Sequence, residues 1–380
     1  MEMSKTFRTL GVLAAIISAT LILIPASAKA TPLFATRNNY PCWKCHVNPN
    51  GGGIRNQTGF AFGKDQTALE ASTNYLNAKF NNFGEFKPVV ADRLQFGADL
   101  RTMWWDQFHD KNTQNYGSSF YMMESAFYAD ANILPILHIT GGYDVAQNTF
   151  EAYGLVDNLP AGLFIQIGRF ILPYGIKLED HSAYTRQFIG FSQLSQDTGV
   201  EIGIRPSPFY AMASISNGDL GNQEINQDKN NYAATAQMGF RFWKVALGAS
   251  FFANRYTGLD RMVYGPYLTA GIWKFAYITE ADIFNQETVK PVDNTNSKFH
   301  RGWAVTHLLD FEIIRGLSVQ ARYCHYDENW KLKDDQKDQV LGGVNFMPLP
   351  FLETTFSYRF NMEIPSIKND EIVGQAHFWF

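Results

Sequence analysis

Charged residues are scarce in this sequence. They make up 18% of the 380 residues, whereas 46% are hydrophobic and 15% are aromatic. A soluble globular domain usually has about 25% charged residues. Basic residues are not in excess either, because 36 acidic residues outnumber 32 basic ones. This balance excludes the broad basic surface with which proteins hold nucleic acids, so we expect no nucleic-acid partner.

Long apolar runs are missing from most of the chain. Beyond residue 30 we find no apolar stretch of the kind that forms a membrane-spanning helix of roughly 20 residues. One run, from Leu10 to Ile24, follows two basic residues and precedes the sequence Ala28-Lys29-Ala30. This order is typical of a secretory signal peptide over residues 1–30, cleaved after Ala30. An uncleaved membrane anchor is the alternative, although the run is short for a span.

Cysteines are few as well, and only three occur. Cys324 has no obvious partner, which argues against a disulfide framework. The other two stand in the sequence Cys42-Trp43-Lys44-Cys45-His46, the attachment pattern of a c-type haem. Each thiol can add to a vinyl group at one edge of the porphyrin, and the imidazole then binds the iron. We therefore expect one covalent haem c, held by Cys42 and Cys45, with His46 as proximal iron ligand.

Three other interpretations of the cysteine pair carry less weight. A zinc site needs about four ligands, and no second Cys or His pair lies nearby. A thioredoxin-like redox pair needs a strand–turn–helix context, whereas Pro, Asn and Gly surround this pair. A disulfide between Cys42 and Cys45 is the third alternative, since an exported protein meets an oxidising environment.

The haem motif opens a small polar segment, residues 31–91. Its sequence continues with Asn48-Pro49-Asn50-Gly51-Gly52-Gly53, which is typical of turns. Apolar residues at positions 69, 76 and 80 indicate a short helix over residues 65–80. The segment is too small for a core of its own, so it should pack against the rest of the chain as a haem-bearing cap or plug.

Residues 92–380 alternate between apolar and polar side chains with a period of two. Leu94–Arg101, Leu317–Tyr323 and Leu352–Phe360 show this strand pattern clearly. The connections distinguish a membrane barrel from a soluble sandwich, because short turns alternate with mostly longer polar loops. The short turns are at 132–135, 158–161, 205–208, 243–244, 273–274, 314–316 and 347–350, and the long loops are at 108–118, 170–197, 218–230, 287–301, 328–337 and 362–370.

Counting the runs gives about 16 strands, an even number as in bacterial outer-membrane barrels. The terminal alternation, ending on Phe380, resembles the signal by which such barrels are recognised for insertion. The sequence therefore predicts an all-β protein: an antiparallel transmembrane β-barrel of about 16 strands over residues 92–380, with a small N-terminal haem-bearing cap or plug. We expect it in the outer membrane of a Gram-negative bacterium, surrounded by outer-membrane lipid.

Pro32-Leu33-Phe34-Ala35, the haem motif and a single barrel together resemble the fused monohaem cytochrome–porins of iron-oxidising bacteria. The sequence Asn48–Gly53 is more similar to related haem–barrel proteins of metal-respiring bacteria. The resemblance implies an outer-membrane electron-transfer protein that connects an extracellular donor or acceptor with a periplasmic electron-carrier cytochrome. Fe(II) is the extracellular metal ion that it suggests, and whether the protein acts as an Fe(II) oxidase stays open.

The distal iron ligand is not fixed by the motif. If Phe380 faces lipid, Phe378 does too and His377 faces the lumen, about 10 Å from the periplasmic rim. His138 lies at a similar depth, three residues after the turn at Pro135. We name His377 and His138 as distal candidates, while lumen histidines that only line a wet pore are the alternative.

Several other polar and aromatic residues have two interpretations each. His109, His181 and His300, in or beside outer loops, either contact an external metal or are solvated. Trp104, Trp105, Trp243, Trp273 and Trp379 near strand ends are best explained as membrane-interface girdles. Lumen arginines either pair with haem propionates and attract anions, or form ordinary ion pairs with neighbours such as Asp99 and Glu353; they are Arg101, Arg241, Arg322 and Arg359.

Two alternatives to electron transfer remain from the sequence alone. A barrel of 16 strands is wide enough for an aqueous channel, so a solute porin whose haem segment gates or senses is one. A barrel that sheathes a separate multihaem cytochrome is the other.

Overall fold

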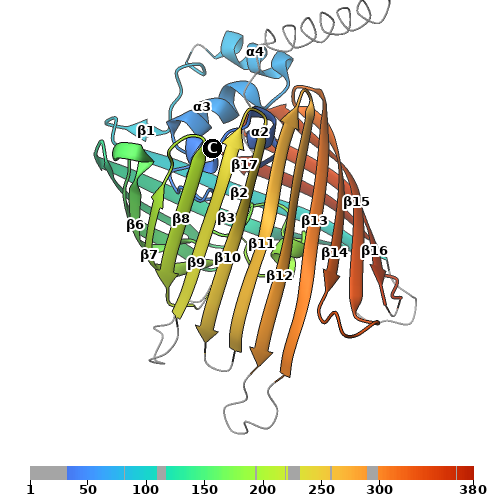
Figure 1. Ribbon diagram of the computed structural model, residues 1–380. Helices are drawn as coiled ribbons and strands as arrows, with labels where there is room; N and C mark the ends of the chain where they lie inside the picture. Colours follow the sequence, from blue (N-terminus) through green and yellow to red (C-terminus); the bar gives the residue numbers. More distant parts are fainter. Residues whose placement is uncertain are drawn as a thin grey trace, which may run out of the picture.

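The computed structural model describes residues 32–380 except 81, 109–116, 193–194, 219, 221–231, 257–258, 289–297 and 365. The predicted signal peptide over residues 1–30, with its cleavage site after Ala30, lies outside the described residues. Most of the described chain forms one antiparallel sheet closed as a barrel, and helices gather at one end of it (Figure 1). Among the described residues, no helix is long and apolar enough to cross a membrane.

Sixteen strands build the barrel wall, which confirms the predicted fold class and strand number. Each strand pairs with its neighbours in sequence, and β17 pairs with β2 to close the wall. A two-residue strand, β1, pairs antiparallel with the start of β2 at one rim. The strands are β1 (Val89–Val90), β2 (Leu94–Gln107), β3 (Ser119–Leu134), β4 (Leu137–Asp144), β5 (Thr149–Val156), β6 (Phe164–Ile171), β7 (Gln196–Ile204), β8 (Phe209–Ser216), β9 (Tyr232–Phe242), β10 (Val245–Tyr256), β11 (Leu259–Ile272), β12 (Phe275–Thr288), β13 (Lys298–Ile314), β14 (Leu317–Asp327), β15 (Gln336–Leu349), β16 (Leu352–Glu363) and β17 (Glu371–Trp379).

The outer face of the wall is apolar, as the alternation predicts. On β8, Phe209 and Ile215 are exposed on the outside, whereas Tyr210 and Met212 are buried on the inside. Trp243 is likewise exposed at the turn between β9 and β10. A closed wall satisfies its own backbone, and an apolar outer face requires lipid. The protein is therefore an outer-membrane barrel in contact with membrane lipid.

The two rims differ in the length of their connections. All seven predicted short turns join consecutive strands at the same rim, which we call the short-turn rim. Most of the longer connections join strand ends at the opposite rim. Bacterial barrels place their short turns on the periplasmic side, so the short-turn rim faces the periplasm.

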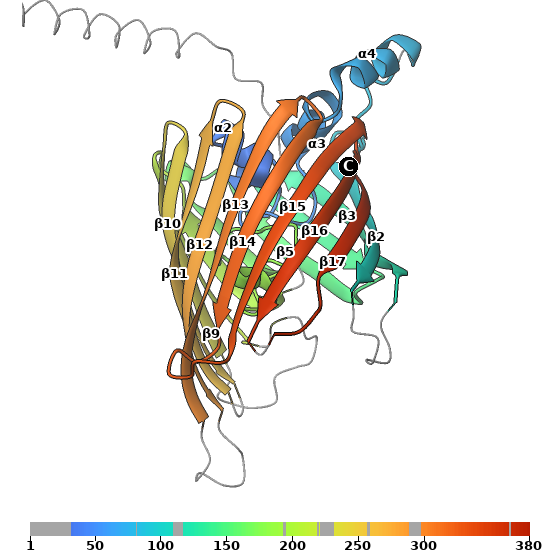
Figure 2. The same cartoon turned by 90° about the vertical axis from the view of Figure 1, so that its right-hand side faces the viewer.

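Residues 32–88, which we call the plug, occupy the short-turn rim (Figure 2). Near the haem motif the plug is anchored by Asn39, whose side-chain oxygen accepts from Arg241 of β9 at 2.9 Å. Arg37 forms a buried ion pair with Asp310 of β13. Its helical elements are α2 (Pro32–Asn38), the 3-10 turn η1 (Cys42–Lys44), α3 (Gln57–Gln66) and α4 (Glu70–Lys79), and a second 3-10 turn, η2 (Pro160–Gly162), lies in the barrel.

The expected helix over residues 65–80 is only partly right. Two helices cover the region, because Asn56 starts α3 early by accepting a hydrogen bond from the Gly59 amide at 3.0 Å. The chain then breaks before α4, where the Leu69 amide donates to the Met347 carbonyl of the rim at 3.0 Å. A tertiary contact with the barrel thus interrupts what the local pattern shows as one helix.

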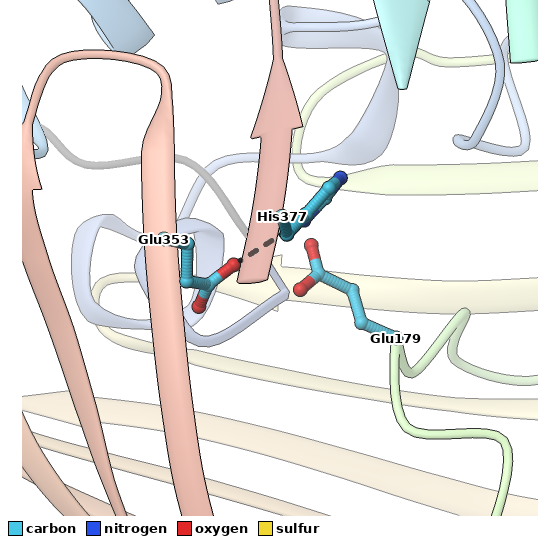
Figure 3. Close-up of side chains that lie close together, drawn as sticks. All are labelled: Glu179, Glu353 and His377. Atoms are coloured by element: carbon cyan, nitrogen blue, oxygen red, sulfur yellow. Dashed lines mark ion pairs between the residues drawn. The ribbon is translucent and has the colours of Figure 1, made fainter. Parts of the chain in front are cut away.

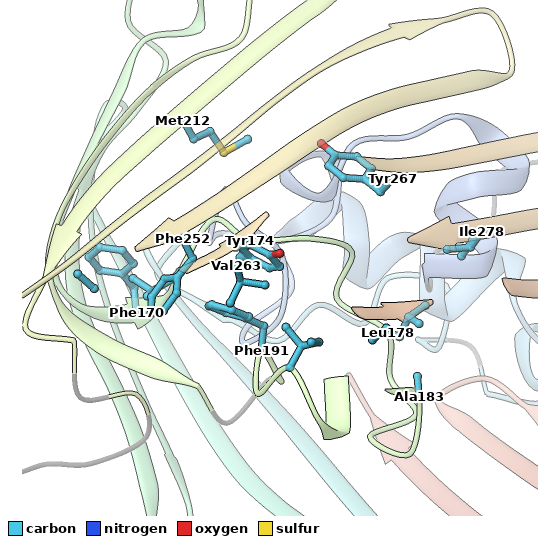
Figure 4. Close-up of a cluster of buried hydrophobic side chains, with 14 of the residues drawn as sticks. Phe170, Tyr174, Leu178, Ala183, Phe191, Met212, Phe252, Val263, Tyr267 and Ile278 are labelled. Atoms are coloured by element: carbon cyan, nitrogen blue, oxygen red, sulfur yellow. The ribbon is translucent and has the colours of Figure 1, made fainter. Parts of the chain in front are cut away.

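The connection between β6 and β7, residues 172–195, folds into the lumen instead of standing outside as an outer loop. It carries a short helix, α5 (Tyr184–Gln187). Tyr174 stacks on Phe191 with ring centroids 4.0 Å apart, and Phe191 meets Phe252 of β10 at 4.8 Å (Figure 4). The connection turns inward because its apolar side chains are removed from water when they pack inside the barrel.

The prediction that Trp379 belongs to a membrane-interface girdle is wrong. Only 2% of Trp379 is exposed. It points inward, where the Arg55 guanidinium of the plug lies 4.2 Å from its ring and Phe351 packs edge-on. Trp243 and Trp273 are exposed at the short-turn rim, where an aromatic girdle is expected.

Candidate haem-binding site

The haem motif lies on one tight turn of the plug. The amides of Cys45 and His46 both donate to the Cys42 carbonyl, at 3.1 and 3.0 Å, so η1 winds through less than two turns. The Asn56 amide donates to the Cys45 carbonyl at 2.9 Å and holds the turn from its other side. Two thiols and an imidazole are thus presented from one short stretch of backbone.

All three residues border a cavity inside the barrel. Its volume is about 1210 Å³, including the part that is open to solvent. Cofactor sites are typically concave, with apolar walls and a few polar groups, and this cavity has that mixed lining. The Cys42 side chain is exposed to this cavity although protein surrounds it, and Cys45 is buried. The barrel side of the cavity includes Tyr210, Met212, Gln237, Arg241, Ala246 and Tyr267.

His46 has the protonation state that an iron ligand needs. Burial, together with the positive charge of Arg55, lowers the pKa of His46 to about 4. The imidazole is therefore neutral at physiological pH, the form that binds a metal. Its Nδ1 atom is buried and makes no regular hydrogen bond, although the peptide groups of Gly52 and Gly53 lie near the ring.

The two cysteines do not have the environment of a zinc or redox pair. Burial raises the pKa of Cys42, and it raises that of Cys45 to about 11. Both thiols are therefore protonated at neutral pH, whereas redox and metal-binding cysteines act as thiolates. In the part of the chain that the structure describes, neither of them joins a cluster of further His, Cys or carboxylate ligands.

Glycine is required at position 51, where the plug passes close to Cys42 of the haem motif. Gly51 has φ of +82°, and a Cβ added there would lie 3.0 Å from the Cβ of Cys42 and 3.3 Å from its sulfur. A side chain at this position would crowd the thiol and strain the backbone. Gly51 therefore keeps one side of Cys42 clear.

Four cationic side chains border the cavity: Arg55, Arg101, Lys177 and Arg241. Arg55 pairs with Asp99 at 3.1 Å, and Arg101 lies 3.4 Å from Glu124. Lys177 and Arg241 differ, because no carboxylate of the described residues pairs with either of them. Lys177 donates to the carbonyls of Leu172 and Tyr174, whereas Asn39 takes only one nitrogen of Arg241, which is half-buried. A cation without a carboxylate partner at the edge of the cavity matches the propionate groups that a haem carries. With the thiols and His46, the residues present fit a covalently attached haem.

The two distal candidates lie outside the wall of this cavity. His377 faces the lumen as the parity predicts, but its Nε2 lies 3.0 Å from Asp99 and its Nδ1 lies 3.5 Å from Glu353. His138 also lies on an inward-facing position, where Asp130 holds its Nδ1 at 3.0 Å. Among the described residues that border the cavity, neither histidine appears, so both stay predictions as iron ligands.

The remaining histidine and arginine candidates lie in different surroundings. His109 lies outside the described residues, and His300 stands near the loop end of β13, edge-on to Phe284. His181 lies in the infolded connection, where burial lowers its pKa to about 4. The ordinary ion pairs expected for two arginines are present: Arg322 and Arg359 both pair with Asp180, and Arg359 also pairs with Glu371.

Sequence reasoning missed several residues of this site. Tyr210 packs edge-on against Trp43 of the motif, with ring centroids 5.5 Å apart, and its hydroxyl lies 2.5 Å from that of Tyr267. Both tyrosines, and Met212, hold inward positions of strands whose facing the alternation already gives. The missing information was which strands border the plug, and no local pattern contains it.

Known structures support the fold. No protein-family model matches the sequence, and no curated relative was found. Among solved structures, a loop-deletion mutant of OmpT from Vibrio cholerae is similar, with a TM-score of 0.57 and 12% identity over 76% of this chain and 99% of that one. An anion-selective porin from Comamonas acidovorans gives 0.55 and 8%, over 76% and 99%. The channel DcaP of Acinetobacter baumannii gives 0.53 and 11%, over 78% and 99%. The chain therefore has the architecture of an outer-membrane porin barrel.

Proposed function

We propose that this porin-type barrel is an electron-transfer protein of the outer membrane, with one covalent haem c on its plug. The observation that carries the proposal is the placement of Cys42, Cys45 and His46 around a large cavity inside the lumen. A haem supplies an iron that cycles between the ferrous and ferric states. The cysteines would hold that group, His46 would bind its iron, and Arg241 would pair with a propionate.

The position of the plug indicates from which side of the membrane each redox partner would reach the haem. The plug lies at the short-turn rim, which is the periplasmic side, so a soluble periplasmic cytochrome would meet the protein there. An extracellular donor or acceptor, with Fe(II) as the candidate, would come from the long-loop side. One haem cannot bridge a hydrocarbon core of about 30 Å alone, so the lumen position of the cavity matters for this proposal.

A solute porin is the second candidate, favoured by the similarity to an anion-selective porin and a channel. The lumen argues against a wide pore, because open porins have polar, water-filled interiors. Here the infolded connection buries Tyr174, Phe191 and Phe252 inside the barrel, and the plug occupies one rim. We therefore expect planar bilayers to show almost no steady ionic current from the intact protein, and a large current would favour the porin.

The decisive experiment is expression in a bacterial host with an active cytochrome c maturation system. Mass spectrometry should find one haem joined to Cys42 and Cys45, and visible spectra should show reduction by Fe(II) and oxidation by a periplasmic cytochrome. The double variant Cys42→Ala/Cys45→Ala should fold as a barrel but carry no covalent haem. Unmodified cysteines in the wild-type protein would overturn the proposal. Copurification of a second, multihaem cytochrome would instead favour the sheath alternative.

A further inference from the structure

Outside the haem motif, three potential metal ligands from distant parts of the chain converge in the lumen. Glu179 comes from the infolded connection, Glu353 from β16 and His377 from β17 (Figure 3). One ligand atom from each lies within 4.8 Å of the other two. Glu353 and His377 are buried, with 4% and 1% of their surface exposed, and Glu179 is half-buried.

A hydrogen bond on its far side orients the histidine. The Nε2 atom of His377 lies 3.0 Å from Asp99, whose carboxylate is also held by Arg55 at 3.1 Å. A carboxylate paired with an arginine is an acceptor, so Nε2 carries the proton. The lone pair of Nδ1 then lies on the side of the cluster, where Glu353 and the Arg101 guanidinium are each 3.5 Å from it. A carboxylate behind a histidine in this way is the usual support of a metal-binding imidazole.

Carboxylates outnumber arginines around the cluster. Four carboxylates lie together here, those of Asp99, Glu124, Glu179 and Glu353, and the arginines among them are Arg55 and Arg101. Arg55 pairs with Asp99 and Arg101 with Glu124, so neither arginine forms an ion pair with Glu179 or Glu353. One oxygen of Glu353 is fully buried and accepts no hydrogen bond. A buried carboxylate is costly unless a cation or a donor satisfies it.

The backbone of the infolded connection is fixed at this place. Arg101 donates from Nη1 to the carbonyl of Glu179 at 3.1 Å, and its Nη2 lies 3.5 Å from Nδ1 of His377. No hydrogen bond or ion pair of the Glu179 carboxylate is found within the described residues, so its oxygens are available to a ligand. Arg101 therefore holds the backbone of Glu179 beside His377 without a hydrogen bond to the carboxylate of Glu179 or Glu353.

We propose that Glu179, Glu353 and His377 form a binding site for a divalent transition-metal cation. One imidazole with two carboxylates suits Fe(II), Mn(II) or Zn(II), and a divalent cation would supply the positive charge that neither arginine gives to Glu179 or Glu353. Asp99 holds the imidazole from behind, and Arg101 holds the loop that carries Glu179. Binding of the cation involves no covalent or redox step.

The position of Glu179 connects this site with the haem cavity. Glu179 borders that cavity and also a second cavity of about 760 Å³, which Glu353 borders as well. A cation held here would lie beside the space reserved for the haem. The interpretation of the cation as Fe(II) on its way to be oxidised rests on the proposed electron-transfer function, whereas the metal site does not.

Manganese is the probe for the test, because Mn(II) is stable in air and its free form gives a sharp electron paramagnetic resonance signal. The folded barrel is purified in detergent, whether or not it carries haem, and titrated with MnCl₂; bound Mn(II) is read from the loss of that signal. The variants are Glu353→Gln, Glu179→Gln and His377→Gln. Glu371→Gln is the matched control, because Glu371 is another lumen carboxylate of β17 that pairs with Arg359 and lies outside the cluster.

We expect one Mn(II) per wild-type barrel, an unchanged affinity in Glu371→Gln and affinities at least about tenfold weaker in the three cluster variants. Heat-modifiable mobility in gels verifies that each variant is folded. Glu179→Gln is the variant least expected to misfold, because Glu179 lies on a connection and not in the barrel wall. Absence of Mn(II) binding to the wild type, or equal weakening in the control, overturns the site. If Mn(II) binds but Fe(II) does not reduce the haem, the proposed function fails and the metal site stands.

Discussion

The side chain of Asn50 ties the plug to the inner wall of the barrel through Glu201. Its amide nitrogen donates to Oε2 of Glu201 on β7 at 2.7 Å and to the carbonyl of Ile171 at 2.9 Å. Glu201 is fully buried, and its other oxygen has no hydrogen-bond partner. Asn50 also borders the haem cavity, so one side chain both anchors the plug and shapes the candidate site.

Replacing Asn50 with Ala should loosen the plug. The change leaves a buried carboxylate without its donor, which costs about 1–3 kcal/mol and more for a charged group. Limited proteolysis should then cleave residues 32–88 faster, while the barrel itself keeps its unfolding temperature. Glu201→Gln is the control, because a glutamine oxygen still accepts from Asn50 and carries no charge. Equal protection of the plug in Asn50→Ala and the wild type would contradict this role.

Gly51→Val should reduce haem attachment without unfolding the barrel. A β-branched side chain is strained at φ of +82°, and its Cβ would press on the Cys42 thiol. The ratio of haem absorbance to protein measures the effect, and we expect a severalfold decrease. At Gly117 an added Cβ would meet nothing within 4 Å, so Gly117→Val is the matched control and should load haem normally. Full loading of Gly51→Val would show that the thiol does not need this space.

The barrel was predictable because it follows from a period of two, which every strand repeats on its own. Short turns such as Trp243-Lys244 indicated which strand ends share a rim, and the terminal Phe380 indicated the last strand of the barrel. The haem motif was equally local, since Cys42, Cys45 and His46 are neighbours in the chain. Those features need no knowledge of how distant segments meet.

What the sequence did not contain is long-range contact. Nothing in the pattern near Glu179 indicates that residues 172–195 turn inward, because their apolar side chains find partners on strands distant in the sequence, such as Phe252 of β10 and Tyr326 of β14. The cluster of Glu179, Glu353 and His377 is therefore invisible until the barrel is closed. Trp379 was misassigned for the same reason: an aromatic near a strand end is typical of a girdle until the plug is placed beside it.

The infolded connection should be released by Arg186→Ala. Arg186 and Glu280 are both fully buried and form an ion pair, so removing the arginine leaves an uncompensated charge, at a cost of about 3–5 kcal/mol. With the connection displaced, the lumen should conduct, and single-channel currents in planar bilayers should appear where the wild type is nearly silent. Arg255→Ala, an exposed position on β10, should leave the current unchanged. A silent Arg186→Ala barrel with a protease-resistant connection would contradict this prediction.

Arg241→Gln should lower the midpoint potential of the haem that we propose for the plug. The ferric haem carries one more positive charge than the ferrous haem, so a neighbouring cation disfavours the ferric form and raises the potential. Arg241 borders the cavity without a carboxylate partner among the described residues, so its charge is not cancelled locally. Arg359→Gln is the control, because Asp180 and Glu371 already compensate that arginine, which is not among the residues bordering the cavity. Spectroelectrochemical titration of the three proteins at one pH should place Arg241→Gln below the wild type and Arg359→Gln close to it. An unchanged potential in Arg241→Gln would mean that the arginine is too far from the iron to act on it, and the propionate pairing would then be wrong.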